Sequence, residues 1–166
     1  FPFCSDNSDQ MGGVCGSDCY NDVYDLGYTA TAIDAGAFHT LALQSDGTVD
    51  AWGLNAYGEV SGASSMSGVV AVSGGDYFSL ALKSDGTVWG WGYNASGQLG
   101  DNSTTNRSTP VQTSSLSGVI AISAGGSHSL ALKSDGTVWA WGSNGEGQLG
   151  DNSTTQRNTP VQVSGL

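Results

Sequence analysis

The stretch Ser129-Leu-Ala-Leu-Lys-Ser-Asp-Gly-Thr-Val-Trp-Ala-Trp-Gly142 decides the fold, because nearly the same residues occur twice more in the chain. Ser79 to Gly92 repeats it with one change, Gly90 in place of Ala140, and Thr40 to Gly53 repeats it more loosely. In each copy an Asp-Gly pair separates two runs of strand-forming residues, and Asp-Gly is typical of a two-residue type I′ hairpin turn. The sequence therefore predicts three β-hairpins.

If the Asp-Gly pair of the third copy forms the whole loop, the register of that hairpin follows. Leu132 then lies opposite Trp139, and Leu130 lies opposite Trp141. Because side chains alternate across a strand, these four bulky residues share one face. The other face carries smaller residues, namely Ala131, Val138 and Ala140. A sheet with one bulky and one small apolar face is suited to stacking, so we expect repeated layers or blades.

Composition favours an all-β chain and argues against two classes of partner. The 166 residues include 26 glycines, and only 11% are charged. We find no amphipathic helix and no apolar run of membrane-spanning length. The formal net charge is −11, with four Lys and Arg residues in all. Nucleic acids and anionic membrane surfaces are bound through Lys and Arg, so we expect this chain to bind neither. The lack of a long apolar run predicts that there is no membrane span.

Several features favour an extracellular, secreted protein. The chain begins at Phe1, as a processed secretory protein does, and its cysteines are confined to the first 19 residues. Asn-x-Ser/Thr sequons supply four candidate glycosylation sites, Asn94, Asn102, Asn106 and Asn152.

Residues 1–28 are expected to form a separate acidic arm. In an oxidising compartment we expect one disulfide among Cys4, Cys15 and Cys19, which leaves one thiol for a bond to another chain or to a partner residue elsewhere. Clustered aspartates also suggest a calcium site, with Asp6 and Asp9 as candidate ligands, but their spacing does not match an EF-hand loop. A solvated arm tied by a disulfide is the simpler interpretation, and it needs no cofactor.

The rest of the chain aligns with itself. The period is 50 residues from Asp85 to Asp135 and 39 residues from Asp46 to Asp85, so the first copy is the shorter one. A period near 50 with three or four short strands per unit is typical of β-propeller blades. We therefore predict an all-β fold in which residues 29–166 form three propeller-type repeats. Their expected bounds are 29–67, 68–117 and 118–166.

The repeats resemble a known family. The third copy reads Val-Ile-Ala-Ile-Ser-Ala-Gly-Gly-Ser-His-Ser-Leu-Ala-Leu at 119–132, Asp-Gly-Thr-Val-Trp-Ala-Trp-Gly-Ser-Asn at 135–144, Gly-Gln-Leu-Gly at 147–150 and Thr-Pro-Val at 159–161. This pattern is similar to the regulator of chromosome condensation repeat. The resemblance implies a β-propeller, usually of seven blades, and its relatives include extracellular propellers that only bind proteins. Three blades cannot close such a ring, so the sequence is either a segment of a longer protein or one of several chains that complete one another's blades.

Two histidines are the residues that a nucleophile triad would use. His39 and His128 each precede a hydroxyl-bearing residue. Both occupy one repeat position, which is Phe78 in the second copy, so packing explains them better than catalysis. The turn chemistry of Asp-Gly likewise explains three aspartates, Asp46, Asp85 and Asp135. We expect no enzymatic activity.

The large apolar residues of the hairpins are expected between blades. The predicted inter-blade core is Trp52, Trp91, Trp141, Leu41, Leu80 and Leu130. Trp89 and Trp139 are replaced by Asp50 in the first copy, and the register above places Asp50 opposite Leu43. We expect that face of the first blade to be partly wet. Alternatively, Trp89 and Trp139 lie at a rim and contact sugar rings or a protein partner.

Two functions agree with these observations. The first is a secreted, non-enzymatic structural protein that assembles into a homo-oligomer, polymer or filament. The second is an extracellular protein- or glycan-binding module, an adhesin or an inhibitor, that acts through the propeller loops.

Overall fold

The computed structural model describes residues 29–166, and these residues form three antiparallel β-sheets. The first sheet has three strands, β1 (Ala30–Ala35), β2 (His39–Gln44) and β3 (Val49–Gly53). The second has β4 (Val69–Gly74), β5 (Phe78–Lys83), β6 (Val88–Gly92) and β7 (Arg107–Gln112). The third has β8 (Val119–Ala124), β9 (His128–Lys133), β10 (Val138–Gly142) and β11 (Arg157–Gln162). A short 3-10 helix, η3 (Ala63–Ser65), precedes the second sheet.

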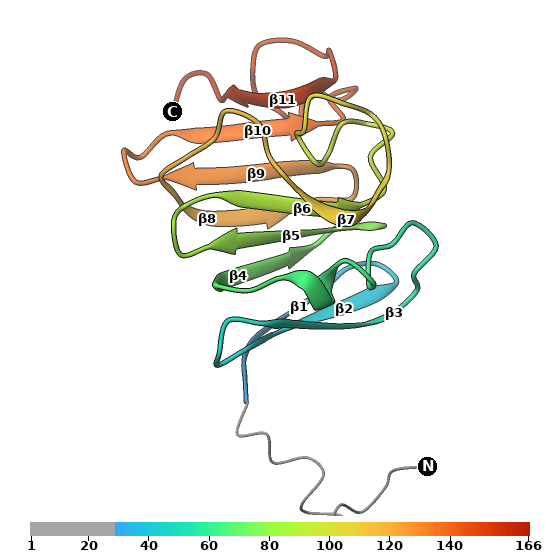
Figure 1. The fold of residues 1–166 in the computed structure, drawn as a ribbon. Coiled ribbons are helices and arrows are strands. Elements are labelled where there is room, and N and C mark those ends of the chain that lie inside the picture. The colour runs from blue at the N-terminus through green and yellow to red at the C-terminus, as the bar shows by residue number, and fades with distance from the viewer. Residues whose placement is uncertain (1–28) are drawn as a thin grey trace, which may run out of the picture.

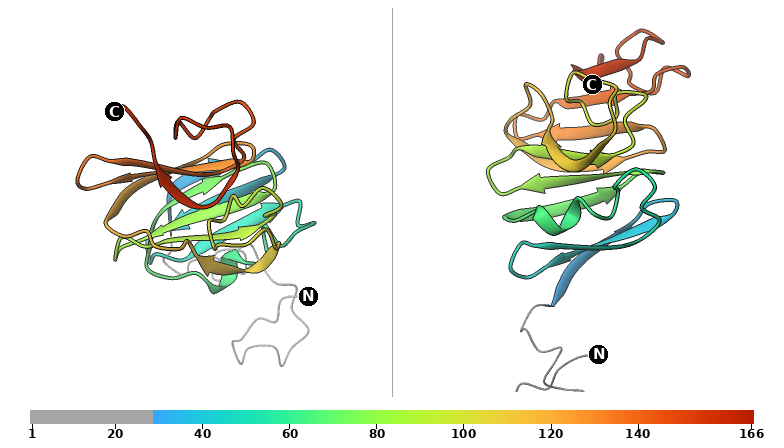
Figure 2. Two further views of the ribbon diagram at one scale, coloured as in Figure 1. Left: turned by 90° about the horizontal axis from the view of Figure 1, so that it is seen from above. Right: turned by 45° about the vertical axis from the view of Figure 1, so that its right-hand side comes forward.

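The three sheets are stacked in chain order, from the blue first sheet to the orange and red third sheet (Figure 1). The two further views show the same succession of layers (Figure 2). Each sheet falls within one of the three expected repeats, and the strands within a sheet follow chain order. The predicted all-β fold of propeller-type blades is confirmed.

The hairpin loops have three residues, not two, so the predicted register is wrong by one residue. In the third sheet Lys133 N donates to Thr137 O at 2.9 Å, and Gly136 N donates to Lys133 O at 3.0 Å. A type I′ turn needs a positive φ at two residues. Here Gly136 has φ +84°, whereas Asp135 is not in the left-handed region. Asp135 instead accepts hydrogen bonds at Oδ1 from the N–H and the hydroxyl of Thr137, at 3.0 and 2.6 Å. This is the three-residue loop that ends in a glycine bulge.

The corrected register redistributes the side chains. Trp139 lies opposite Ala131, and Trp141 lies opposite Ser129, while Leu132 lies opposite Val138. The leucines and the tryptophans therefore occupy opposite faces, and each face combines large with small residues, contrary to the prediction of one bulky and one small face. The same shift places Asp50 opposite Ala42 rather than Leu43. Asp50 is exposed and accepts a hydrogen bond from Gln44 Nε2 at 2.6 Å, as expected for a wet face.

Substitution of Gly136 tests the turn. A Cβ added at Gly136 would meet nothing within 4 Å, so the strain of a positive φ is the only penalty that alanine would introduce. We expect Gly136→Ala to lower the free energy of unfolding by about 1 kcal/mol, measured by urea denaturation. Gly145 is the matched control, because it also has open space around it but no left-handed φ. Equal effects of Gly136→Ala and Gly145→Ala would contradict this account of the loop.

Candidate functional site

Each sheet has two different apolar faces. One side of each sheet carries two leucines and a valine, and we call this side the leucine face. These residues are Leu41, Leu43 and Val49 in the first sheet, Leu80, Leu82 and Val88 in the second, and Leu130, Leu132 and Val138 in the third. The opposite side of each sheet carries an alanine and a tryptophan, and we call it the tryptophan face. These residues are Ala42 and Trp52 in the first sheet, Ala81 and Trp91 in the second, and Ala131 and Trp141 in the third.

The sheets are joined by packing a leucine face against the tryptophan face of the next sheet. One buried cluster brings Leu41 and Leu43 together with Trp91, and a second brings Leu80 and Leu82 together with Trp141. Trp91 and Trp141 are fully buried. Burial of this apolar surface is the main stabilising term of each joint between sheets.

Hydrogen bonds complete both joints. The indole Nε1 of Trp91 donates to Glu59 O, and that of Trp141 donates to Gln98 O, each at 2.8 Å. These acceptors lie in the loop that follows the third strand of the preceding sheet. The strand β4 also contributes Ser73, whose Oγ accepts a hydrogen bond from Ala124 N at 3.0 Å. Such bonds fix the orientation of two apolar faces that could otherwise slide.

The first strand of each sheet carries a polar residue at the same repeat position, and this position was not identified from the sequence. Asp34 accepts hydrogen bonds from Ser73 Oγ and Gly74 N at Oδ2, both at 2.9 Å. Asp34, Ser73 and Ser123 are equivalent residues of successive repeats, so alignment of the repeats would have identified this position. In the third sheet Ser123 is exposed.

Two faces are left uncovered within residues 29–166. On the tryptophan face of the first sheet, Ile33 is 74% exposed and Trp52 is 54% exposed. On the leucine face of the third sheet, Leu132 is 36% exposed. The predicted inter-blade core is thus wrong for Trp52, because none of the described residues packs over it. Leu130 is half-buried for the same reason, although its equivalents Leu41 and Leu80 are fully buried.

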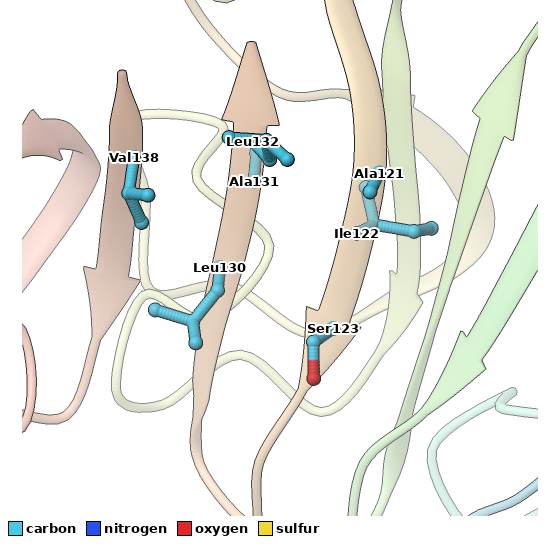
Figure 3. A pocket seen from close by; sticks show the side chains of 7 residues that line it. All are labelled: Ala121, Ile122, Ser123, Leu130, Ala131, Leu132 and Val138. Carbon is cyan, nitrogen blue, oxygen red and sulfur yellow. The ribbon is translucent and has the colours of Figure 1, made fainter. Parts of the chain in front are cut away.

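The open leucine face contains a shallow apolar hollow of about 190 Å³. Figure 3 shows its lining side chains, which come from β8, β9 and β10 and include Ser123, Leu130, Leu132 and Val138. The equivalent leucines of the second sheet pack against Trp141. The hollow therefore corresponds to the place where a tryptophan face docks in the internal joints.

Trp89 and Trp139 lie partly buried beside the joints. The Nζ of Lys83 lies 5.5 Å from the ring centroid of Trp89, and that of Lys133 lies 5.6 Å from Trp139. Each indole also donates to a turn threonine, Thr87 or Thr137, at 3.0 Å. Both rings pack against the inter-sheet clusters, so a contact with sugar or protein stays a prediction for them.

His39 contacts a serine, but the two side chains belong to the packed joint between the first and second sheets. Its Nε2 lies 2.9 Å from Ser79 Oγ, and that hydroxyl donates to Glu59 O at 3.0 Å. Ser79 is fully buried, and burial lowers the pKa of His39 below its ordinary value despite the carboxylates of Glu59 and Asp34. A hydroxyl that gives its proton to a carbonyl and has no access to substrate is not an activated nucleophile.

The predicted glycosylation sites separate into two groups. Asn94 is fully buried, and its Nδ2 donates to Asp101 Oδ1 at 3.1 Å and to Thr105 O at 3.1 Å. This candidate is wrong for the folded chain, because a glycan would replace one of these N–H groups and has no space. Three sequon asparagines are exposed, Asn102, Asn106 and Asn152.

The loop of the third repeat is held by a buried carboxylate. The side chain of Asp151 is 6% exposed and accepts hydrogen bonds from Ser153 Oγ at 2.7 Å and from Arg157 Nε at 2.7 Å. Hydrogen bonds from Ser153, Arg157 and Asn144 lower the pKa of Asp151 to about 2, although desolvation opposes them.

Residues 1–28 contain several predicted sites that lie outside the described residues, namely Cys4, Cys15, Cys19, Asp6 and Asp9. Across residues 29–166, no group of three His, Cys, Asp or Glu side chains is arranged to hold a metal ion. The same part of the chain has no helix that is long and apolar enough to cross a membrane.

Acid unfolding tests the Asp151 site. The pKa of Asp151 is lower in the folded chain than the value of about 3.9 in an unfolded chain, so its stabilisation is complete above about pH 4 and is lost as the pH falls through about 2. We expect Asp151→Asn to be less stable than the parent at neutral pH and to lose less stability between about pH 4 and pH 2. Urea denaturation at several pH values measures both slopes, and equal slopes would refute the assignment.

Comparison with known proteins agrees with the geometry. Two models of the regulator of chromosome condensation (RCC1) repeat match, one over residues 30–59, 69–98 and 119–148 and the other over 85–132 and 135–166. No curated protein matches the sequence.

Solved structures share the stacked sheets. Human WBSCR16 is 26% identical with a TM-score of 0.67, and the alignment covers 82% of this chain and 39% of WBSCR16. Prp20p from Saccharomyces cerevisiae is 20% identical with a TM-score of 0.69, covering 82% of this chain and 38% of Prp20p. The structure of Prp20p was studied together with its binding to Gsp1p and histones. The chain thus spans about two fifths of these structures, and its three blades, joined leucine face to tryptophan face, belong to the RCC1 repeat family.

Proposed function

We propose that this chain is a non-enzymatic, secreted interaction module that associates head to tail with copies of itself. In this assembly the leucine face of the third sheet receives the tryptophan face of the first sheet of a second copy. The proposal rests on one observation. Each internal joint is formed by a leucine face and a tryptophan face, and within residues 29–166 one face of each kind is left uncovered. Exposed apolar surface of this kind marks an interaction site.

The individual contacts of the internal joints have counterparts on the open faces. Trp52 corresponds to Trp91, which fills the leucine face of the preceding sheet. Ser123 corresponds to Ser73, which accepts a backbone N–H from the next sheet. His128 corresponds to His39, whose ring contacts Ser79, and a second copy would offer Thr40 at the place of that serine.

The contact is heterologous, because one copy uses its third sheet and the other its first. Every added copy leaves one leucine face and one tryptophan face open. Such a contact produces a ring when the rotation closes and a filament when it does not.

Two complementary variants test this arrangement. Leu132→Asp places a charge on the leucine face, and Trp52→Asp places one on the tryptophan face. A charge buried without a partner in a joint is costly, so we expect each variant alone to be monomeric while the parent grows with concentration. An equimolar mixture should form heterodimers only, because one intact joint remains and both outer faces are blocked. Light scattering over a concentration series measures the masses.

Val70→Asp is the control, because Val70 is 52% exposed and lies outside both open faces. It should assemble like the parent. Urea denaturation of each variant separates a lost contact from a lost fold, and Trp52→Asp changes a side chain that is already exposed. A parent that stays monomeric at all concentrations, or a mixture of folded variants that forms no heterodimer, would refute the proposal.

The extracellular part of the proposal rests on composition and on the exposed sequons. Asn152 is exposed in the loop of the third repeat, and Asn102 is its equivalent in the second. Expressed in a glycosylating secretory host, the chain should carry N-glycans that a glycosidase removes, and Asn152→Gln should carry one fewer. Intact mass measures this number. An unmodified chain from a host that glycosylates a control protein would contradict the prediction.

A further inference from the structure

Four aromatic side chains gather at one end of the first two sheets. They are Phe38 from the loop between β1 and β2, Tyr57 from the loop after β3, Tyr77 from the loop between β4 and β5, and Tyr93 just after β6. We call this group the aromatic cluster. It lies at the end of the sheets opposite the Asp-Gly turns, and it belongs to neither buried inter-sheet cluster.

The rings of the aromatic cluster contact one another. Phe38 and Tyr77 are stacked, with centroids 5.1 Å apart. Tyr57 and Tyr93 are 4.8 Å apart, and both also approach Tyr77, at 5.7 and 6.3 Å. Phe38 is 54% exposed and Tyr57 is 37% exposed, so ordered ring surface faces solvent.

The fold does not require aromatic residues at these positions. The backbone of each repeat is closed by the same hydrogen bond, from Leu54 N to Phe38 O, from Tyr93 N to Tyr77 O, and from Ser143 N to Ser127 O, at 2.9, 2.9 and 2.8 Å. The third repeat keeps this frame with serines in place of the tyrosines. The aromatic side chains of Phe38, Tyr77 and Tyr93 therefore need a reason other than the backbone.

Charge indicates the kind of partner. The chain has a net charge of −11, and its four Lys and Arg residues are engaged internally. Arg107 and Arg157 form ion pairs of 2.8 and 2.7 Å with aspartates, and the lysines lie over Trp89 and Trp139. Asp76, next to Tyr77, is exposed. An aromatic surface in a negative field is suited to a cation, because the ring faces attract ammonium and guanidinium groups.

We infer that the aromatic cluster is a docking surface for a protein segment that carries exposed arginine or lysine side chains. The cationic groups lie over the tyrosine and phenylalanine rings, and Asp76 supplies an opposite charge at the edge. This surface is separate from the open sheet faces, so the inference does not depend on head-to-tail assembly.

Peptide binding tests the inference. The probe is a fluorescent peptide of alternating glycine and arginine, and the reference is the same peptide with glutamine in place of arginine. We expect the arginine peptide to bind and the glutamine peptide to bind at least about tenfold more weakly. The double variant Tyr77→Ser with Tyr93→Ser copies the third repeat and leaves the net charge unchanged, and it should lose about tenfold in affinity for the arginine peptide.

Two further variants distinguish the cluster from general charge and from general apolar surface. Val70→Ser removes an exposed apolar side chain elsewhere and should bind like the parent. The pair Tyr77→Leu with Tyr93→Leu keeps apolar volume but removes the ring faces, so it should lose the preference for arginine even if the serine variant folds poorly.

Fluorescence anisotropy at several salt concentrations measures these affinities. Equal binding of the arginine peptide to the parent and to folded serine or leucine variants would show an effect of net charge alone and would overturn the inference. Equal binding of the two peptides, or tighter binding of a neutral oligosaccharide than of the arginine peptide, would also overturn it.

Discussion

The contact between a leucine face and the tryptophan face of the next sheet is the constraint on which the rest of the structure depends. Each sheet is thin and apolar on both sides, so no sheet has a core of its own. Trp91 and Trp141 reach full burial only because a preceding sheet covers them, and their indole N–H groups are satisfied by carbonyls of a preceding loop. Stability therefore lies mainly between sheets, as in other repeat proteins.

The loops are free to differ because the joints carry this stability. The frame that holds Phe38 and Tyr77 in two repeats holds Ser127 in the third, with the same backbone hydrogen bond. At the opposite end, the Asp-Gly-Thr loops are the same in all three repeats, because the carboxylate of Asp135 and the positive φ of Gly136 leave little choice. One end of the stack is thus fixed by turn chemistry, while the side chains at the other end vary between repeats.

The sequence was sufficient to predict the repeats, the hairpins and the propeller-type sheets, because these follow from strand propensity and period. It was insufficient for the register, because Asp-Gly occurs in both two-residue and three-residue loops. The threonine after each Asp-Gly, whose hydroxyl and N–H bind the aspartate, was the available signal.

Exposure could not be predicted from the repeat pattern. Trp52 looks equivalent to Trp91 in sequence, but its burial depends on a neighbouring sheet rather than on its own residues. Asn94 matches a sequon, yet its side-chain amide is hydrogen-bonded within a loop that closes around it. Pairs such as Asp34 with Ser73, and the cluster around Tyr77, arise from contacts between repeats, which a single repeat does not reveal.

The first sheet differs from the others in one way that would limit the strength of the proposed joint between copies. Trp89 and Trp139 pack partly buried at the edge of the internal joints, but the equivalent residue of the first sheet is Asp50. In the proposed assembly, a joint between copies would contain the equivalent of the buried tryptophan, Trp52, but no second tryptophan at its edge. It would leave Asp50 in water or bear the cost of its desolvation. Because Gln44 already binds this carboxylate at the solvent side, the edge stays wet. Association between copies should then be weaker than the joints within a chain, and so reversible with concentration, whereas the internal joints hold as long as the chain is folded.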